Sequence, residues 1–116
     1  MPKLPNAELA TIEGRKIMGY LLAESHLKGT GKAGFFAGFG FRREAAEVLA
    51  AALLAHASSN EVLFLQSSQY GVKYVIEGPL VAPDGRAPSV RAVWIVDAGD
   101  DAPRFVTAFP GRRIIP

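Results

Sequence analysis

His26 is the residue in this sequence best suited to proton transfer, and it lies just before a glycine-rich stretch, Gly29 to Gly34. An imidazole titrates near pH 6.5, at about neutral pH, so it can serve as an acid or a base. Lys28 and Lys32 carry positive charge in the same segment, beside the exposed N–H groups of a predicted helix start, which attract anions. The segment therefore predicts acid–base chemistry next to a phosphate site. A solvated loop, with His26 bonded to backbone, is the alternative interpretation.

The glycines of this segment also match G-x-G-x-x-G, the fingerprint of dinucleotide-binding folds. That fingerprint follows a strand and opens a helix within a βαβ unit. Here a helical pattern precedes it and the predicted sheet is antiparallel, so the dinucleotide interpretation fails. The phosphate loop of nucleotide-hydrolysing folds fails as well, because His26 stands at its first glycine position and Ala33 replaces the magnesium-binding hydroxyl.

A second group of candidate residues lies in the C-terminal half of the chain. Lys73 and Arg91 occupy positions that strand alternation places on the same face of a sheet. Arg104 joins them if the register allows it. Thr107, near the end of the same strand as Arg104, adds a hydroxyl that could hold a phosphate with it.

The arginines of this group also have structural interpretations, which the sequence leaves open. Arg91 could pair across a hairpin with Glu77, which lies on the neighbouring strand and points to the same face of the sheet. Arg104 could form a salt bridge with Asp100 or Asp101. Lys73 has no such obvious acidic neighbour.

Metal and cofactor sites have little support in the sequence. There is no cysteine, and the only histidines are His26 and His56, so no ligand set is in view and we expect neither a metal nor a cofactor. His56 falls in the last turn of a predicted helix, where interaction with the helix C-terminus accounts for it.

The elements that would position these residues divide the chain into a helical half and a sheet half. Apolar spacing predicts helices over 13–23, 32–38 and 42–57 within about residues 1–60. Alternating apolar residues predict strands over 62–66, 72–80, 90–97 and 104–109 within about residues 61–110. We therefore expect an α+β fold, with N-terminal helices packed on one face of a four-stranded antiparallel β-meander.

The same alternation predicts which side chains share a face. If the helices cover the side of Trp94, the opposite face is open and carries the cations over an apolar floor. We expect that floor to consist of Val75, Val93 and Ile95. In the last strand, strict alternation puts Phe105, Thr107 and Phe109 together and Arg104 on the other side.

Composition sets broader limits. The 116 residues are 49% hydrophobic and 21% charged, which is typical of one globular domain spanning 1–116. A net charge of +2 is too small to argue for nucleic acid by itself. No apolar run is long enough to cross a membrane, and no signal peptide is recognisable, so we expect a cytoplasmic protein of unknown oligomeric state.

Several segments together resemble a family of small bacterial and phage domains, mostly of unknown function. They are Leu4-Pro5-Asn6-Ala7-Glu8, Tyr20-Leu21-Leu22, the run from His26 to Phe36, Gly40-Phe41, Tyr70-Gly71-Val72-Lys73-Tyr74, Gly78-Pro79-Leu80, Pro83-Asp84-Gly85-Arg86, Val90-Arg91-Ala92-Val93-Trp94 and Pro103-Arg104-Phe105-Val106-Thr107-Ala108. Some members are stand-alone proteins whose neighbouring gene encodes a small β-barrel-like protein. Others are C-terminal domains of phage head proteins and polymorphic toxins. The resemblance covers nearly the whole chain.

This family context, with helices followed by an antiparallel sheet, is similar to the barnase–colicin–RelE group of metal-independent ribonuclease toxins. The resemblance implies a toxin-like domain and a small cognate partner of antitoxin or immunity type. Two positions depart from the family pattern, because Ala92 stands where threonine is usual and Phe109 where tyrosine is usual.

Two functions follow as hypotheses. In a ribonuclease, His26 is the acid or base, and Lys73, Arg91 and Thr107 complete the catalytic group. Lys28, Lys32 and Arg104 would then hold phosphate. In the alternative, the chain is a non-catalytic interaction domain that binds its small partner through the open sheet face.

Overall fold

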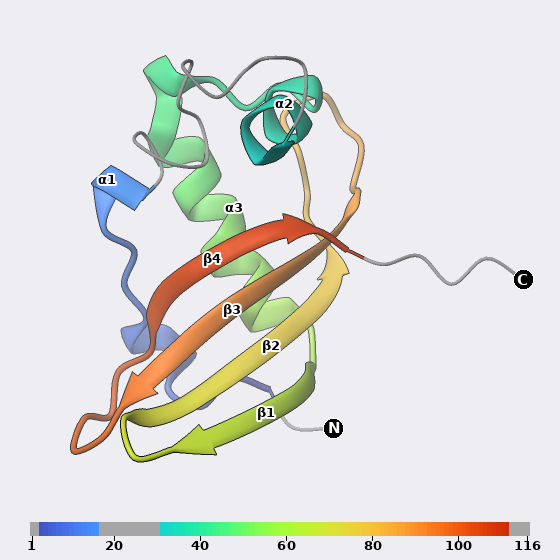
Figure 1. Cartoon of the computed structure of the whole chain (residues 1–116). Helices are drawn as coiled ribbons and strands as arrows, with labels where there is room; N and C mark the ends of the chain where they lie inside the picture. Colours follow the sequence, from blue (N-terminus) through green and yellow to red (C-terminus); the bar gives the residue numbers. More distant parts are fainter. Residues whose placement is uncertain (1–2, 17–30, 112–116) are drawn as a thin grey trace, which may run out of the picture.

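The computed structural model describes residues 3–16 and 31–111. The strands form one four-stranded antiparallel sheet in which each strand pairs with the next along the chain, and the helices precede them. In Figure 1, the long helix α3 (Ala46–Ser59) runs behind the sheet. The α+β meander predicted from the sequence is therefore confirmed.

The helices agree with the sequence prediction where the structure describes them. They are α1 (Gly14–Lys16), α2 (Gly31–Gly38) and α3 (Ala46–Ser59). Short 3₁₀ helices at Ala7–Leu9 and Arg43–Ala45 precede α1 and α3. Most of the helix predicted over 13–23 lies outside the described residues.

The long helix α3 is built from alanine and leucine, which have high helix propensity. Leu49, Leu53, His56 and Ala57 are its buried residues, and their spacing makes one stripe along the helix. Asn60 ends the helix, because both its backbone N–H and its side-chain amide donate to the carbonyl oxygen of His56, at 3.1 and 3.0 Å. The stripe faces the sheet and fixes which of its faces is covered.

The sheet is a meander of short, closely paired strands. They are β1 (Val62–Ser68), β2 (Gly71–Pro79), β3 (Ser89–Asp97) and β4 (Arg104–Pro110). A turn connects β2 and β3, with Gly85 at φ 90° and its N–H donating to the Ala82 carbonyl at 3.1 Å. Positive φ is the reason that this turn needs glycine.

A bulge at Val106 changes which residues of β4 share a face. Trp94 pairs with Phe105, whereas the neighbouring Val93 pairs with Thr107, so Val106 is an extra residue. The extra residue resets the alternation. Phe105 is buried on the helix side, and Thr107 faces the other side of the sheet. The expectation that Phe105 and Thr107 share a face is therefore wrong.

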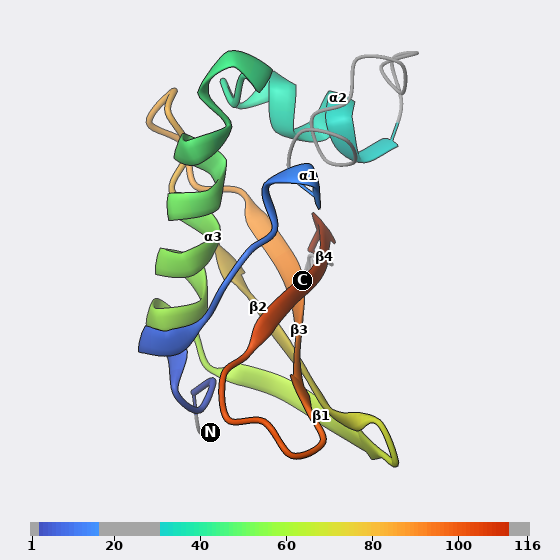
Figure 2. The ribbon, with the colours of Figure 1, turned by 90° about the vertical axis from the view of Figure 1, so that its left-hand side faces the viewer.

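The core lies between α3 and the sheet. Trp94 and Phe105 are its centre, with their rings edge to face at 5.4 Å, and both are almost fully buried. Figure 2 shows α3 along one side of the sheet, and none of the described helices runs along the opposite side. That opposite side is the open face. In the described part of the chain, no helix is long and apolar enough to span a membrane.

Candidate functional site

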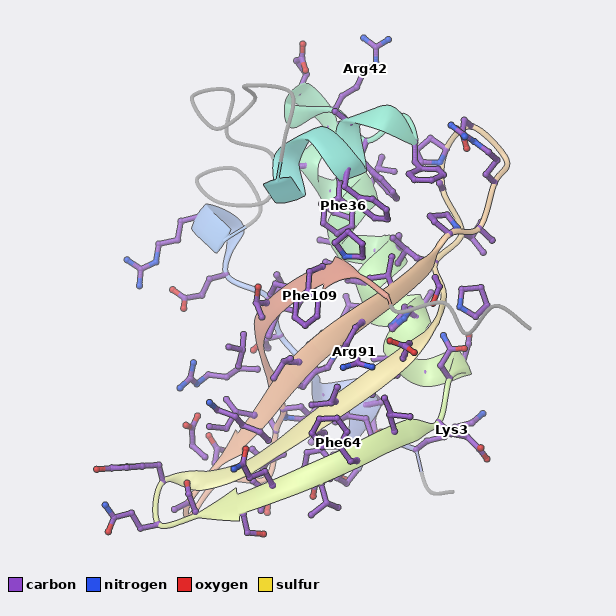
Figure 3. The ribbon with its side chains drawn as sticks, turned by 45° about the vertical axis from the view of Figure 1, so that its right-hand side comes forward. Lys3, Phe36, Arg42, Phe64, Arg91 and Phe109 are labelled. Atoms are coloured by element: carbon purple, nitrogen blue, oxygen red, sulfur yellow. The ribbon has the colours of Figure 1, made fainter. Side chains whose placement is uncertain are left out.

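A groove of about 320 Å³ lies on the open face and receives side chains from every strand. Its lining residues are Phe64, Gln66, Lys73, Val75, Arg91, Val93, Val106, Thr107 and Phe109. We call this hollow the sheet groove. Figure 3 shows Phe64, Arg91 and Phe109 on the same side of the sheet, coming from β1, β3 and β4. Three residues predicted to be catalytic, Lys73, Arg91 and Thr107, therefore line one groove.

Strand register explains this convergence. Lys73 pairs with Gln66 of β1, so both point out of the open face. On the other edge of the groove, Arg91 of β3 pairs with Phe109 of β4. Directly paired residues of antiparallel strands lie on the same face with their Cβ atoms about 5 Å apart. The polar side chains therefore stand in neighbouring rows across the sheet.

Valines form the floor of the sheet groove. Val75 pairs with Val93, and Val93 pairs with Thr107, which makes a continuous row across β2, β3 and β4. Ile95, the third residue expected in the floor, is buried and does not line the groove. The result is an apolar base with polar groups at its sides, a composition typical of ligand sites.

Arg91 is held by Glu77. Its Nε donates to Oε1 of Glu77 at 2.8 Å, and the two side chains retain only 25% and 19% of their accessible surface. The cross-strand pair that the sequence left open is therefore present. It fixes the guanidinium at the groove wall and offsets its charge. Lys73 is exposed, and the described residues give it no ion pair.

Arg104 does not join the sheet groove. Its Nε and an Nη donate to the two carboxylate oxygens of Asp97, at 2.7 and 3.1 Å. This pair lowers the pKa of Asp97 and raises the pKa of Arg104. The predicted partners, Asp100 and Asp101, are not the ones used. Arg104 is a structural arginine at the start of β4, outside the groove lining.

His26 and Lys28 lie outside the described residues, and the backbone of Lys32 belongs to the first turn of α2. The predicted roles of these three residues remain predictions.

His56 has a different role from the one expected at a helix end. It is buried, and its Nε2 lies 2.8 Å from the Val90 carbonyl oxygen and 3.2 Å from that of Gly78. Both partners are acceptors, so Nε2 carries the hydrogen. Burial lowers the pKa of His56, which keeps the ring neutral. The histidine joins α3 to β2 and β3, and a charge interaction with the helix end does not operate.

A larger hollow of about 630 Å³ lies beside α2, and its lining gives no comparable chemistry. It is formed by Phe35, Phe39, Pro79, Arg86, Ala87, Pro88, Ser89, Pro110 and Gly111. Its arginine is engaged, because Arg86 bonds Asp84 and the Gly38 carbonyl and lies 4.3 Å from the centre of the Phe39 ring. Among the described residues, no group of three or more histidine and carboxylate side chains could hold a metal ion.

Sequence reasoning missed the contribution of β1. Phe64 and Gln66 line the groove, but the pairing of β1 shifts between Val62 and Phe64, so simple alternation along the strand gives no reliable facing. The facing of Gln66 could have been found from its cross-strand partner. Gln66 lies opposite Lys73, so if Lys73 is on the open face, Gln66 must be on that face too.

The comparisons with known proteins agree with this fold. The profile of a family described as a domain of unknown function, DUF6883, matches residues 3–112. The chain belongs to the DUF6883 family. No curated protein matches it.

Among solved structures, the DUF6883 chain is similar to a contact-dependent growth inhibition toxin–immunity protein complex from Klebsiella pneumoniae 342. The TM-score is 0.65 and the sequence identity is 19%, over 86% of this chain and 98% of that chain. At this identity the likeness establishes a shared fold.

Proposed function

We propose that this DUF6883 domain is a metal-independent ribonuclease of toxin type. The observation that carries the proposal is the convergence of Lys73, Arg91 and Thr107, from three different strands, on one groove between Phe64 and Phe109. An exposed lysine, an arginine oriented by its pair with Glu77 and a hydroxyl in one hollow suit a phosphate group. The fold shared with a toxin–immunity complex supports a toxin-type effector. The proposal includes action in the cytoplasm, on cellular RNA.

The chemistry is cleavage by the RNA's own 2′-hydroxyl. A base removes the 2′-hydroxyl proton, the oxygen attacks phosphorus, and an acid protonates the departing 5′-oxygen, which leaves a 2′,3′-cyclic phosphate. His26 supplies the base or the acid. Lys73 and Arg91 stabilise the negative charge that builds on the phosphorane, and the Thr107 hydroxyl donates to one of its oxygens. Lys28 and Lys32 extend the phosphate contacts.

The aromatic walls suit single-stranded RNA. Phe64 keeps 48% of its surface exposed, and Phe109 lines the opposite side of the groove. Unpaired bases stack on such rings with little dependence on sequence. Phe109 keeps the ring of the family's usual tyrosine without its hydroxyl, so in this chain it contributes stacking only.

The test is cleavage of single-stranded RNA by purified protein in the presence of a metal chelator. We expect cyclic-phosphate products, and we expect His26→Ala to abolish them. Lys73→Ala should reduce the rate about 100-fold, the typical effect of removing one stabilising group. Lys3→Ala is the matched control, because this exposed lysine lies outside the groove. RNA left intact, or cleaved equally well by His26→Ala, would contradict the proposal.

A second function is favoured by the apolar part of the same face. Val75, Val93 and the two phenylalanines give the groove more apolar surface than a solvated sheet needs, and Glu77 offsets the charge of Arg91. In this alternative the domain binds a small cognate protein, as a toxin binds an immunity protein, without cleaving RNA.

This alternative has its own test, a pull-down with the small protein encoded beside family members. Lys73→Glu reverses charge within the face and should abolish capture, whereas Lys3→Glu should not. Equal capture by wild type and Lys73→Glu would exclude the open face as the binding surface.

A further inference from the structure

The outer edge of β1 is unusually apolar for a strand that ends a sheet. β1 is the first strand in the sheet order, and no described strand pairs with its outer side. Leu63, Phe64 and Leu65 are 45%, 48% and 51% exposed. Val62–Ser68 contains no charged residue and no proline, two of the devices that normally prevent edge-to-edge pairing. A third device, a bulge, is present only at Leu63, and the pairing of β1 with β2 is regular from Phe64 to Ser68.

The opposite edge of the sheet, formed by β4, is partly covered by the N-terminal segment of the chain. Thr11 forms a parallel bridge with Arg104 alongside β4. The Thr11 N–H donates to the Pro103 carbonyl at 3.0 Å, and the Thr11 carbonyl accepts from the Phe105 N–H at 2.9 Å. The N-terminal segment thus covers the start of the β4 edge. Within the described residues, β1 has no equivalent cover.

We propose that a second copy of this chain pairs with β1, antiparallel, through the exposed residues Leu63, Phe64 and Leu65. A twofold axis normal to the sheet would pass through Phe64. Phe64 then faces its own counterpart, and Leu63 faces Leu65 of the second copy.

Charge and side-chain type favour this register and this occupant. Centring on Phe64 sets three apolar residues against three apolar residues and leaves Glu61 opposite Ser67, so no like charges meet. A register centred one residue later would set Phe64 against Gln66 and Leu63 against Ser67. The strand is complementary to itself, which is the requirement for an interface between identical chains.

Pairing through β1 has a consequence for the sheet groove. The two sheets become one, with both open faces on the same side and both α3 helices on the other. The Phe64 ring that lines each groove would then pack at the axis against Phe64 of the second copy. The wall of each groove is therefore completed by the other chain. The inference stands independently of ribonuclease activity.

The first test is the mass of the purified protein, measured by size-exclusion chromatography with light scattering over a wide concentration range. We expect a dimer, with twice the 12.4 kDa chain mass. Phe64→Lys sets two positive charges together at the axis and should raise the Kd of the dimer about tenfold or more. Val81→Lys is the matched control, because Val81 is 75% exposed in the β2–β3 connection, away from β1.

The second test locates the contact. The chain has no cysteine, so Phe64→Cys introduces a single thiol, which should form a disulfide with its counterpart under mild oxidation. Val81→Cys should not cross-link. A protein that is monomeric at all concentrations overturns the proposal, including the case in which β1 binds a different protein. So does a dimer that survives Phe64→Lys and fails to cross-link through Phe64→Cys.

Discussion

The buried histidine of α3 makes the stability of this domain sensitive to acid in a way that one substitution can isolate. His56 is 2% exposed and donates through Nε2 to the carbonyl oxygens of Val90 and Gly78, and none of the described residues is a hydrogen-bond partner for its Nδ1. Protonation would put an unpaired N–H and a charge inside the core. Burial accordingly lowers the pKa of His56 below its usual 6.5.

The sign of the effect follows from proton uptake. Below pH 6.5 the unfolded chain protonates His56 and the folded chain does not, so acid favours unfolding. Above pH 6.5 the ring is neutral in both states and the effect vanishes. Between that pH and the lowered pKa of the folded state, the free energy of unfolding falls by up to about 1.4 kcal/mol per pH unit.

The comparison to make is wild type against His56→Gln. Glutamine keeps an N–H donor near the position of Nε2 and has no group that titrates. Its free energy of unfolding should lose the histidine component of the slope and keep the carboxylate component, which both proteins share. Urea unfolding at a series of pH values measures this, with the fluorescence of Trp94, the single tryptophan, as the probe.

Parallel pH profiles for the two proteins between pH 6.5 and pH 5 would refute the reasoning. They would mean that the folded state accepts the proton on His56 as readily as the unfolded chain does. His56→Gln could also be less stable than wild type at every pH. That result would not contradict the reasoning as long as its free energy of unfolding depends less on pH, because lost packing lowers the overall stability and only a titrating group changes the pH dependence.

Two further predictions concern the core and a turn. Phe105→Ala should lower the free energy of unfolding by about 3–5 kcal/mol in the same urea assay, because it opens a cavity beside Trp94; a loss no larger than that of the exposed Phe64→Ala would place Phe105 outside the core. Gly71→Ala should destabilise the protein more than Gly85→Ala, by about 1–3 kcal/mol. Both glycines have positive φ, but a Cβ at Gly71 would collide with the Val96 carbonyl oxygen, whereas a Cβ at Gly85 would meet nothing within 4 Å. Equal melting temperatures for the two variants would contradict the expected difference in stability.

The facing of β2 and β3 could be predicted from sequence because it is a local property. Successive side chains of a strand point to opposite sides, so Trp94 in the core implies Arg91 and Lys73 on the open face once the strands pair in register. The same register makes the pair between Arg91 and Glu77 possible, but the sequence left it as one of two interpretations of Arg91, and the structure shows that the pair forms. The alternating apolar residues of β2 and β3 were enough to predict that the two strands belong to one sheet.

The facing of β4 could not be predicted in this way. The bulge at Val106 moves Thr107 into the sheet groove while Phe105 stays in the core. Neither residue type predicts the bulge, because a bulge is a property of the pairing between two strands and not of one strand's own sequence. Arg104 likewise finds Asp97 across the β3–β4 turn, a choice made by the geometry of that turn.

Residue types and their spacing were enough to predict the order of elements, the helical and sheet halves, and the open face as the side of the sheet that carries Lys73 and Arg91. These depend on periodicity and propensity, which act over a few residues. The three-dimensional packing was needed to show that Phe64 and Gln66 also line the groove, that Arg104 pairs with Asp97 outside it, and that His56 links α3 to two strands. Those outcomes depend on which distant segments pack together, and packing is set by the whole core at once.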